Sequence, residues 1–84
     1  MAYFKIQHEV LTGNEGEWRL CFQWGTYTYE DSSSEKGYRF IWRRPDGSLQ
    51  PARGQARIPS ANDIFHLFHL ATKEGWFVNV ENKE

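Results

Sequence analysis

The chain has 84 residues, a formal net charge of −1, and a composition of 39% hydrophobic and 25% charged residues. A chain of this length forms one small domain that buries only about 60% of the surface exposed when it is unfolded. The composition excludes general disorder, and the near-zero net charge excludes a strong overall attraction to polyanions. We therefore expect a single domain over residues 1–84.

The first third of the sequence predicts two paired strands. Residues 3–11 alternate between apolar and polar side chains, as a half-buried strand requires. The apolar face of this strand is expected to comprise Phe4, Ile6, His8 and Val10. After a glycine-containing turn at 12–16, the alternation resumes at Trp18 and continues to Tyr29, with a bulge or bend expected at Gly25. We expect these strands to form a hairpin.

The middle of the chain predicts a loop and two further strands. Residues 30–37 are polar and rich in serine, which is typical of an exposed loop. Residues 38–44 alternate again and precede a proline–aspartate–glycine–serine turn at 45–48. The following segment, 49–58, contains a proline and a glycine, so we expect an irregular strand at an edge of the sheet.

Residues 60–75 carry the signals of one amphipathic helix. Ser60 is a good N-cap, and Asp63 stands three residues later, in position for a capping box. The apolar side chains that follow at helical spacing are Ile64, Leu67, Phe68 and Ala71. Gly75 is placed to end the helix with a positive φ, and Trp76 to fold back on its last turn.

Together these elements predict an α+β domain with a small antiparallel sheet of three to five strands. Four strands precede the helix as a β-β-β-β-α meander, and residues 77–80 suit a short C-terminal strand before a charged, flexible tail at 81–84. One helix packs on only one face of such a sheet. The other face, which carries Arg39 and Arg43, is therefore expected to tolerate water.

Charge is distributed unevenly along the chain. Residues 1–35 carry a net charge of −4, residues 36–57 carry +5, and residues 58–84 carry −2. The basic segment contains an arginine stripe formed by Arg39, Arg43, Arg44, Arg53 and Arg57. Such a stripe favours contact with phosphates or with a carboxylate-rich partner surface. The alternative is that these arginines pair internally with the acidic first strands.

Aromatic residues are in surplus, at 14 of 84. One helix and one sheet face do not accommodate all the large apolar side chains, which leaves Tyr27, Tyr29, Phe65, Leu70, Trp76 and Phe77. Exposed aromatic and arginine side chains are enriched at protein interfaces. The alternative is that the C-terminal segment wraps over them.

The sequence contains no recognisable catalytic or metal-binding motif. The three histidines fall on different faces, with His8 on the first strand and His66 and His69 on the solvent side of the helix, so they do not predict a metal site. Cys21 is the single cysteine, which excludes an intramolecular disulfide. A small chain without disulfides suits a reducing compartment, and no apolar segment is long enough for a membrane span, so the chain is expected to be cytoplasmic. The lack of a cofactor-binding motif predicts no cofactor.

The sequence therefore favours a non-catalytic interaction module over an enzyme. We expect it to bind a protein partner or to form a homodimer through its surplus aromatic residues. The residues expected to make the contact are Tyr29, Trp76, Arg39 and Arg43. The alternative is a nucleic-acid-binding domain that uses the arginine stripe.

Overall fold

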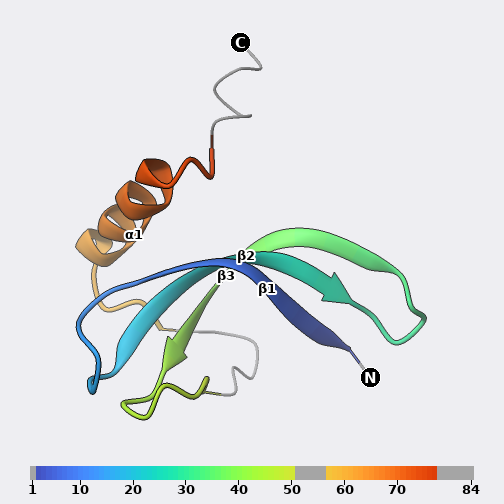
Figure 1. The fold of residues 1–84 in the computed structure, drawn as a ribbon, viewed down its shortest axis with the longest axis horizontal. Helices are drawn as coiled ribbons and strands as arrows, with labels where there is room; N and C mark the ends of the chain where they lie inside the picture. The colour runs from blue at the N-terminus through green and yellow to red at the C-terminus, as the bar shows by residue number, and fades with distance from the viewer. Residues whose placement is uncertain (1, 51–56, 78–84) are drawn as a thin grey trace.

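A computed structural model describes residues 2–50 and 57–77 of the chain (Figure 1). Its elements are β1 (Tyr3–Leu11), β2 (Arg19–Thr28), β3 (Ser34–Arg43) and α1 (Ala61–Lys73). The strands form one antiparallel sheet in the order β1-β2-β3. The predicted α+β class, with an antiparallel sheet and one helix, is confirmed for the described residues.

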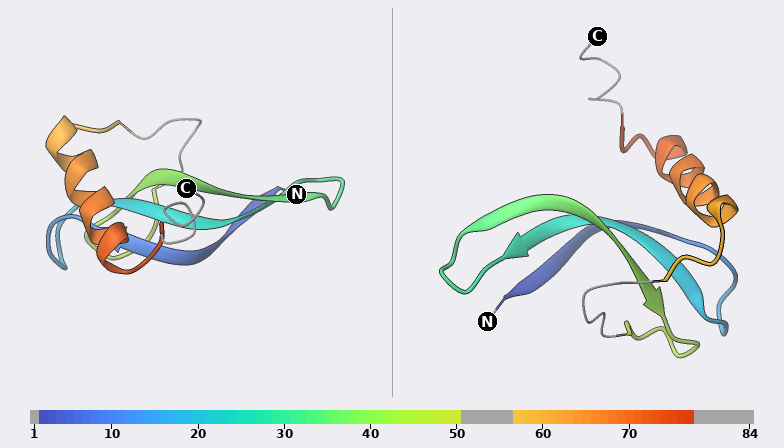
Figure 2. Two further views of the ribbon diagram at one scale, coloured as in Figure 1. Left: turned by 90° about the horizontal axis from the view of Figure 1, so that it is seen from above. Right: turned by 180° about the vertical axis from the view of Figure 1, so that it is seen from behind.

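The sheet arches along its strands, and α1 lies over the convex side near one end of it (Figures 1 and 2). The helix packs mainly on β1 and β2. The opposite end, where β1 begins and β2 turns into β3, extends beyond the helix (Figure 2). We call the two sides of the sheet the helix-side face and the far face.

The main core lies between α1 and the helix-side face. Its buried members are Val10, Leu20, Phe22, Leu67 and Ala71. The Phe22 ring is central, because its centroid lies 4.8 Å from that of Phe40, 5.1 Å from that of Phe68 and 5.5 Å from that of Trp76. Aromatic pairs at these distances stabilise a core beyond the area that they bury.

Both ends of α1 lie where the sequence predicts them. Ser60 is the N-cap, but its side chain accepts no helix N–H, so the predicted side-chain cap is wrong. The Asp63 N–H donates to the Ser60 backbone carbonyl at 3.2 Å, and the Ser60 hydroxyl donates to the Asp63 carboxylate at 3.1 Å. Gly75 adopts a φ of 84°, and the Trp76 N–H donates to the Ala71 carbonyl at 3.1 Å. These features form the expected Schellman motif.

A β-bulge at Gln7 divides β1 into two parts. Ile6 lies opposite Gly25 and His8 lies opposite Trp24, which leaves Gln7 without a partner on β2. The extra residue reverses the alternation of side chains beyond it. The bulge therefore lies in β1, across from the glycine at which the sequence analysis expected it.

The reversal changes which side chains share a face. Phe4 and Ile6 lie on the far face, whereas His8 and Val10 lie on the helix-side face. The prediction that all four share one face is wrong, because the unpaired Gln7 shifts the register, so the side chains before it and after it alternate out of step. The apolar side chains in the first half of β1 thus lie on the far face, and Val10 in the second half packs in the main core.

The connection between β2 and β3 is shorter than predicted. β3 begins at Ser34, which pairs with Thr28, so the expected loop at 30–37 is wrong beyond residue 33. The turn is closed by the Tyr29 N–H, which donates to the Ser33 carbonyl at 2.8 Å. The polar side chains at the start of β3 are typical of a loop, which is why a loop was predicted there. Backbone pairing with β2 stabilises a strand in spite of these side chains.

The predicted fourth and fifth strands lie largely outside the described residues. Leu49 forms an isolated bridge with Arg43, and the Gln50 N–H donates to the Trp42 carbonyl at 2.9 Å. Residues 51–56 are not described, and neither are 78–84, which include most of the expected last strand and the whole charged tail. The described sheet has three strands, and further strands stay a prediction.

Candidate functional site

A polar network crosses all three strands at the centre of the far face. The register places Gln23 directly opposite Glu9 on one side and Arg39 on the other. The Gln23 side chain is fully buried, at 0% exposure. Its amide nitrogen donates to Glu9 at 2.6 Å, and its amide oxygen accepts from Arg39 Nε at 2.7 Å. Both ends of the buried amide are thereby satisfied.

Arg43 completes the network through an ion pair with Glu9. Its Nε and Nη2 donate to the two carboxylate oxygens at 2.9 and 3.1 Å, and its Nη1 donates to the Gly47 carbonyl at 2.6 Å. The hydrogen bonds to Glu9 raise the pKa of Arg43. This two-point geometry is the strong form of an arginine–carboxylate contact. Arg43 therefore pairs internally with an acidic residue of the first strand, which was the alternative role considered for the arginine stripe.

Arg39 has no such carboxylate among the described residues. The ion pair between Arg43 and Glu9 is the one salt bridge found in that part of the chain. The Arg39 guanidinium lies over the Phe4 ring, 4.0 Å from its centroid, and burial lowers the pKa of Arg39. A cation–π contact stabilises a partly desolvated cation. Its terminal nitrogens form no hydrogen bond within the described residues, so Arg39 is free to bind an anion.

The middle of the far face is buried, which corrects the expectation that this face tolerates water. Cys21 and Ile41 lie there beside Gln23 and are as inaccessible as the main core. Burial and the nearby Glu9 carboxylate raise the pKa of the Cys21 thiol to about 12. A thiol that stays protonated at neutral pH is a poor nucleophile. Sequence polarity did not reveal this burial, because long side chains such as that of Arg39 place their apolar stems along the sheet.

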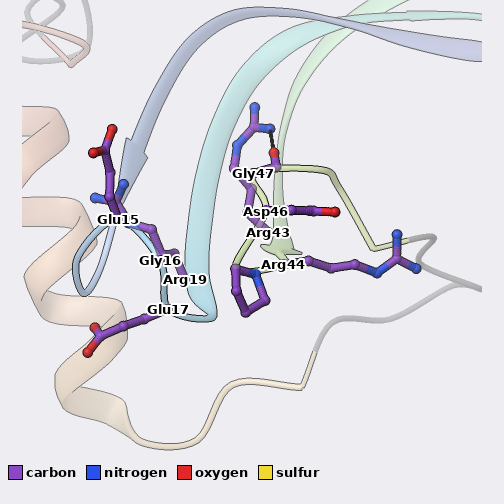
Figure 3. A pocket seen from close by; sticks show the side chains of 9 residues that line it. Glu15, Gly16, Glu17, Arg19, Arg43, Arg44, Asp46 and Gly47 are labelled. Atoms are coloured by element: carbon purple, nitrogen blue, oxygen red, sulfur yellow. Dashed lines mark hydrogen bonds between the residues drawn. The ribbon is translucent and has the colours of Figure 1, made fainter.

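The other predicted arginines do not join this network. Arg44 is exposed in the turn after β3 and lines a cleft of about 370 Å³ whose other wall includes Glu15 and Glu17. Figure 3 shows the Arg44 side chain pointing away from these carboxylates. Arg57 is exposed, and its carbonyl accepts from Trp42 Nε1 at 2.9 Å. Arg53 lies outside the described residues.

The two predicted aromatic contact residues occupy different parts of the molecule. Tyr29 lies at the β2–β3 turn, where its hydroxyl donates to Glu35 at 2.9 Å, and it shares with Arg39 a hollow of about 230 Å³. Trp76 follows α1 and stacks on Phe22. The structure thus brings Tyr29 to Arg39 but leaves Trp76 in the main core.

The place where the exposed aromatic side chains gather was not predicted from the sequence. Tyr38, Phe68 and Phe65 are 44%, 41% and 67% exposed. Tyr38 and Phe68 both contact the Phe22 ring, at 5.4 and 5.1 Å between centroids, and Phe65 lies one helical turn before Phe68. We call these three residues the aromatic surface. It is open because α1 packs on β1 and β2 and leaves β3 less covered, which residue periodicity does not specify.

Residues 2–50 and 57–77 hold neither a cluster of metal ligands nor a helix that could span a membrane. No three histidine, cysteine, aspartate or glutamate side chains in these ranges come together as ligands for a metal ion. Within the same ranges, no helix has both the length and the apolar character needed to cross a membrane.

Comparison of the chain with protein-family profiles, with curated proteins and with solved structures gives no match. The function is therefore inferred from the chemistry of the residues described above.

Proposed function

We propose that this chain is a non-catalytic interaction module that self-associates through protein–protein contacts at the aromatic surface. The observation that supports this proposal is the exposure of Tyr38, Phe65 and Phe68, of which Tyr38 and Phe68 contact the same Phe22 ring. Large exposed aromatic side chains that adjoin one another are uncommon on monomeric proteins and are enriched at interfaces. Aromatic anchors also contribute most to the binding energy of many interfaces.

The states of the cysteine and of the arginines support the same proposal. Cys21, the single thiol, is buried and has a raised pKa, which suits a structural role in a reducing compartment such as the cytoplasm. Arg43 is held by Glu9, and the Nε of Arg39 is held by Gln23. The ion pair with Glu9 draws Arg43 away from phosphate binding, and the bond to Gln23 leaves only the terminal nitrogens of Arg39 open to an anion.

Sedimentation analysis of the protein between about 5 μM and 1 mM tests self-association, and its average mass should rise with concentration. Phe65→Ser should weaken the association by at least about tenfold, since it removes a large aromatic anchor. Tyr3→Ser is the matched control, because Tyr3 is 61% exposed but lies on β1, at the other edge of the sheet. A monomer at every concentration would refute the proposal.

The nucleic-acid alternative is tested by NMR titration of labelled protein with a short mixed-sequence oligonucleotide at two salt concentrations. Arg44 and Arg57 are the exposed arginines among the described residues, so they would show the largest shifts. Phosphate contacts weaken steeply with salt. Salt-dependent shifts at both residues, weakened by Arg44→Ala, would assign nucleic-acid binding in place of protein binding.

A further inference from the structure

The two edges of the sheet differ in their regularity. β1 is interrupted by the bulge at Gln7, whereas β3 pairs with β2 without interruption from Ser34 to Arg43. Bulges protect an edge against pairing with other chains, and a long regular edge invites it. β3 therefore provides the edge that is suited to receive another strand.

The outer side of β3 is occupied at one end only, as far as the described residues show. Leu49 and Gln50 bond to that side next to Arg43 and Trp42. Arg57, where the described chain resumes, also contacts Trp42, through its carbonyl. The part of the edge away from Trp42, residues 34–40, has no partner among the described residues.

The backbone direction of β3 follows from its hydrogen bonds. The Trp42 carbonyl faces outward, because it accepts from Gln50. Alternate residues of a strand direct their amide groups to opposite sides, so Phe40, Tyr38 and Lys36 also present N–H and C=O groups outward. These are the groups that an added antiparallel strand would bond.

Residues 34–40, which have no edge partner among the described residues, are complementary to themselves about Gly37. In an antiparallel pair of two copies centred on this glycine, Glu35 of each copy lies opposite Arg39 of the other, and Lys36 lies opposite Tyr38. Directly opposed charges of unlike sign stabilise a strand pair, and an ammonium group is attracted to a tyrosine ring. Two-fold symmetry makes each contact occur twice.

Registers centred on neighbouring residues lack this complementarity. Centring the pair on Arg39 would bring two copies of this cation face to face, and centring it on Tyr38 would place Glu35 against Ile41. Like charges directly opposite one another destabilise a strand pair. The charge pattern therefore selects Gly37 as the centre.

Arg39 supplies an independent reason for the same register. Its guanidinium is partly desolvated over Phe4, and its terminal nitrogens have no acceptor among the described residues. A carboxylate from a second copy would provide one. Gly37 allows the close approach, because it carries no side chain on the far face and its nearest neighbour there is the Tyr27 ring.

We infer that two copies of this chain pair antiparallel through β3, centred on Gly37, and form a continuous six-stranded sheet with two Glu35–Arg39 ion pairs. The inference rests on the proposed self-association and specifies its register. The occupant of the β3 edge is thus a second copy of the same strand.

A cysteine at the centre tests the register directly. Residues with inward-facing amides form the non-hydrogen-bonded pairs of the new ladder, so the two Gly37 positions would be about 4.5 Å apart at Cα, within the roughly 4.4–6.8 Å that a disulfide spans. Gly37→Cys should give a covalent dimer in an oxidising glutathione buffer at about 100 μM, while buried Cys21 stays reduced. Ser34→Cys is the control, because six residues of strand, about 20 Å, separate it from its counterpart.

Charge reversal gives a second test that does not depend on oxidation. Glu35→Arg and Arg39→Glu should each abolish dimerisation, since each variant opposes like charges in its own dimer. A mixture of the two variants should form a heterodimer, because both of its pairs are then of opposite sign. Circular dichroism of each variant alone establishes that it is folded.

The outcomes separate the register from the proposed function. If the unmodified protein self-associates while Gly37→Cys cross-links no more than Ser34→Cys, the β3 register is wrong and association through the aromatic surface stands. If the protein stays monomeric at about 1 mM, its dimer dissociation constant is weaker than about 1 mM. Both proposals are then wrong. Efficient cross-linking of Gly37→Cys together with heterodimer formation would establish the register.

Discussion

Glu9 holds the far face together, because it accepts one hydrogen bond from Gln23 and two from Arg43. Glu9→Ala would leave a buried amide and a cation without their acceptor. We expect the free energy of unfolding to fall by about 2–4 kcal/mol. Urea unfolding of the protein and the variant, at a concentration where both are monomeric, measures this loss.

A matched control separates the network from charge in general. Glu30 is exposed in the β2–β3 turn, so Glu30→Ala should change the unfolding free energy by less than about 0.5 kcal/mol. A double-mutant cycle with Arg43→Met should give a coupling of about 1–3 kcal/mol between Arg43 and Glu9. Equal effects of Glu9→Ala and Glu30→Ala would show that the network contributes nothing to stability.

The Cys21 thiol should make stability depend on alkaline pH. Its pKa rises from 9.0 to about 12 in the folded protein, so the unfolded chain loses the thiol proton first. The stabilisation is complete below pH 9.0 and is lost toward pH 12, at about 1.4 kcal/mol per pH unit. Between pH 8 and 10.5 the protein should lose roughly 2 kcal/mol more unfolding free energy than Cys21→Ala. Parallel pH profiles for the two proteins would contradict this.

At the scale of the elements, local signals predicted α1 and failed for β1. α1 begins after Ser60 and ends before Gly75, and both residues are signals that act within one turn of the chain, so sequence suffices to find these ends. The bulge at Gln7 depends on pairing with β2, which is not a local property. One signal was available, since Gln7 is the first of three consecutive polar residues and their run breaks strict alternation.

The bulge packs the Phe4 ring over Gly25, so position 25 has no room for a side chain. A Cβ at Gly25 would lie 2.6 Å from Phe4 Cζ and would also collide with the Lys5 carbonyl. Gly25→Ala should therefore lower the unfolding free energy by about 2–4 kcal/mol, measured by urea unfolding. Gly37→Ala is the control, because its Cβ would meet only the Tyr27 ring, at 3.6 Å. A loss at Gly25 no larger than at Gly37 would argue against this packing.

The sequence indicated which kinds of residue form the candidate site, but it did not indicate where in the fold these residues lie. The charge segregation left internal pairing open as one of two roles for Arg43, and its partner Glu9 followed only from the strand register. The aromatic surplus was visible in the sequence, whereas its location depends on which strands α1 covers. That choice is made by the whole core, because a helix can pack at several positions on a three-stranded sheet.

For the whole molecule, the proposed dimer should respond to salt. The two Glu35–Arg39 pairs would lie at the dimer seam, where added ions screen them. We expect the dissociation constant to rise several-fold between about 0.05 and 0.5 M NaCl, as measured by sedimentation. Association through aromatic contacts alone would be unchanged or strengthened by salt, and that result would favour the aromatic surface without the β3 register.

The bulge at Gln7 also constrains how the length of the chain can vary. Inserting or deleting one residue between Lys5 and His8 would exchange the side chains that β1 gives to the two faces. One residue more or fewer in the turn at 29–33 would leave both faces as they are. Among natural variants of this chain, length differences should therefore accumulate in the turns and be absent around Gln7. A related protein is then recognised by an ungapped β1 more reliably than by overall identity.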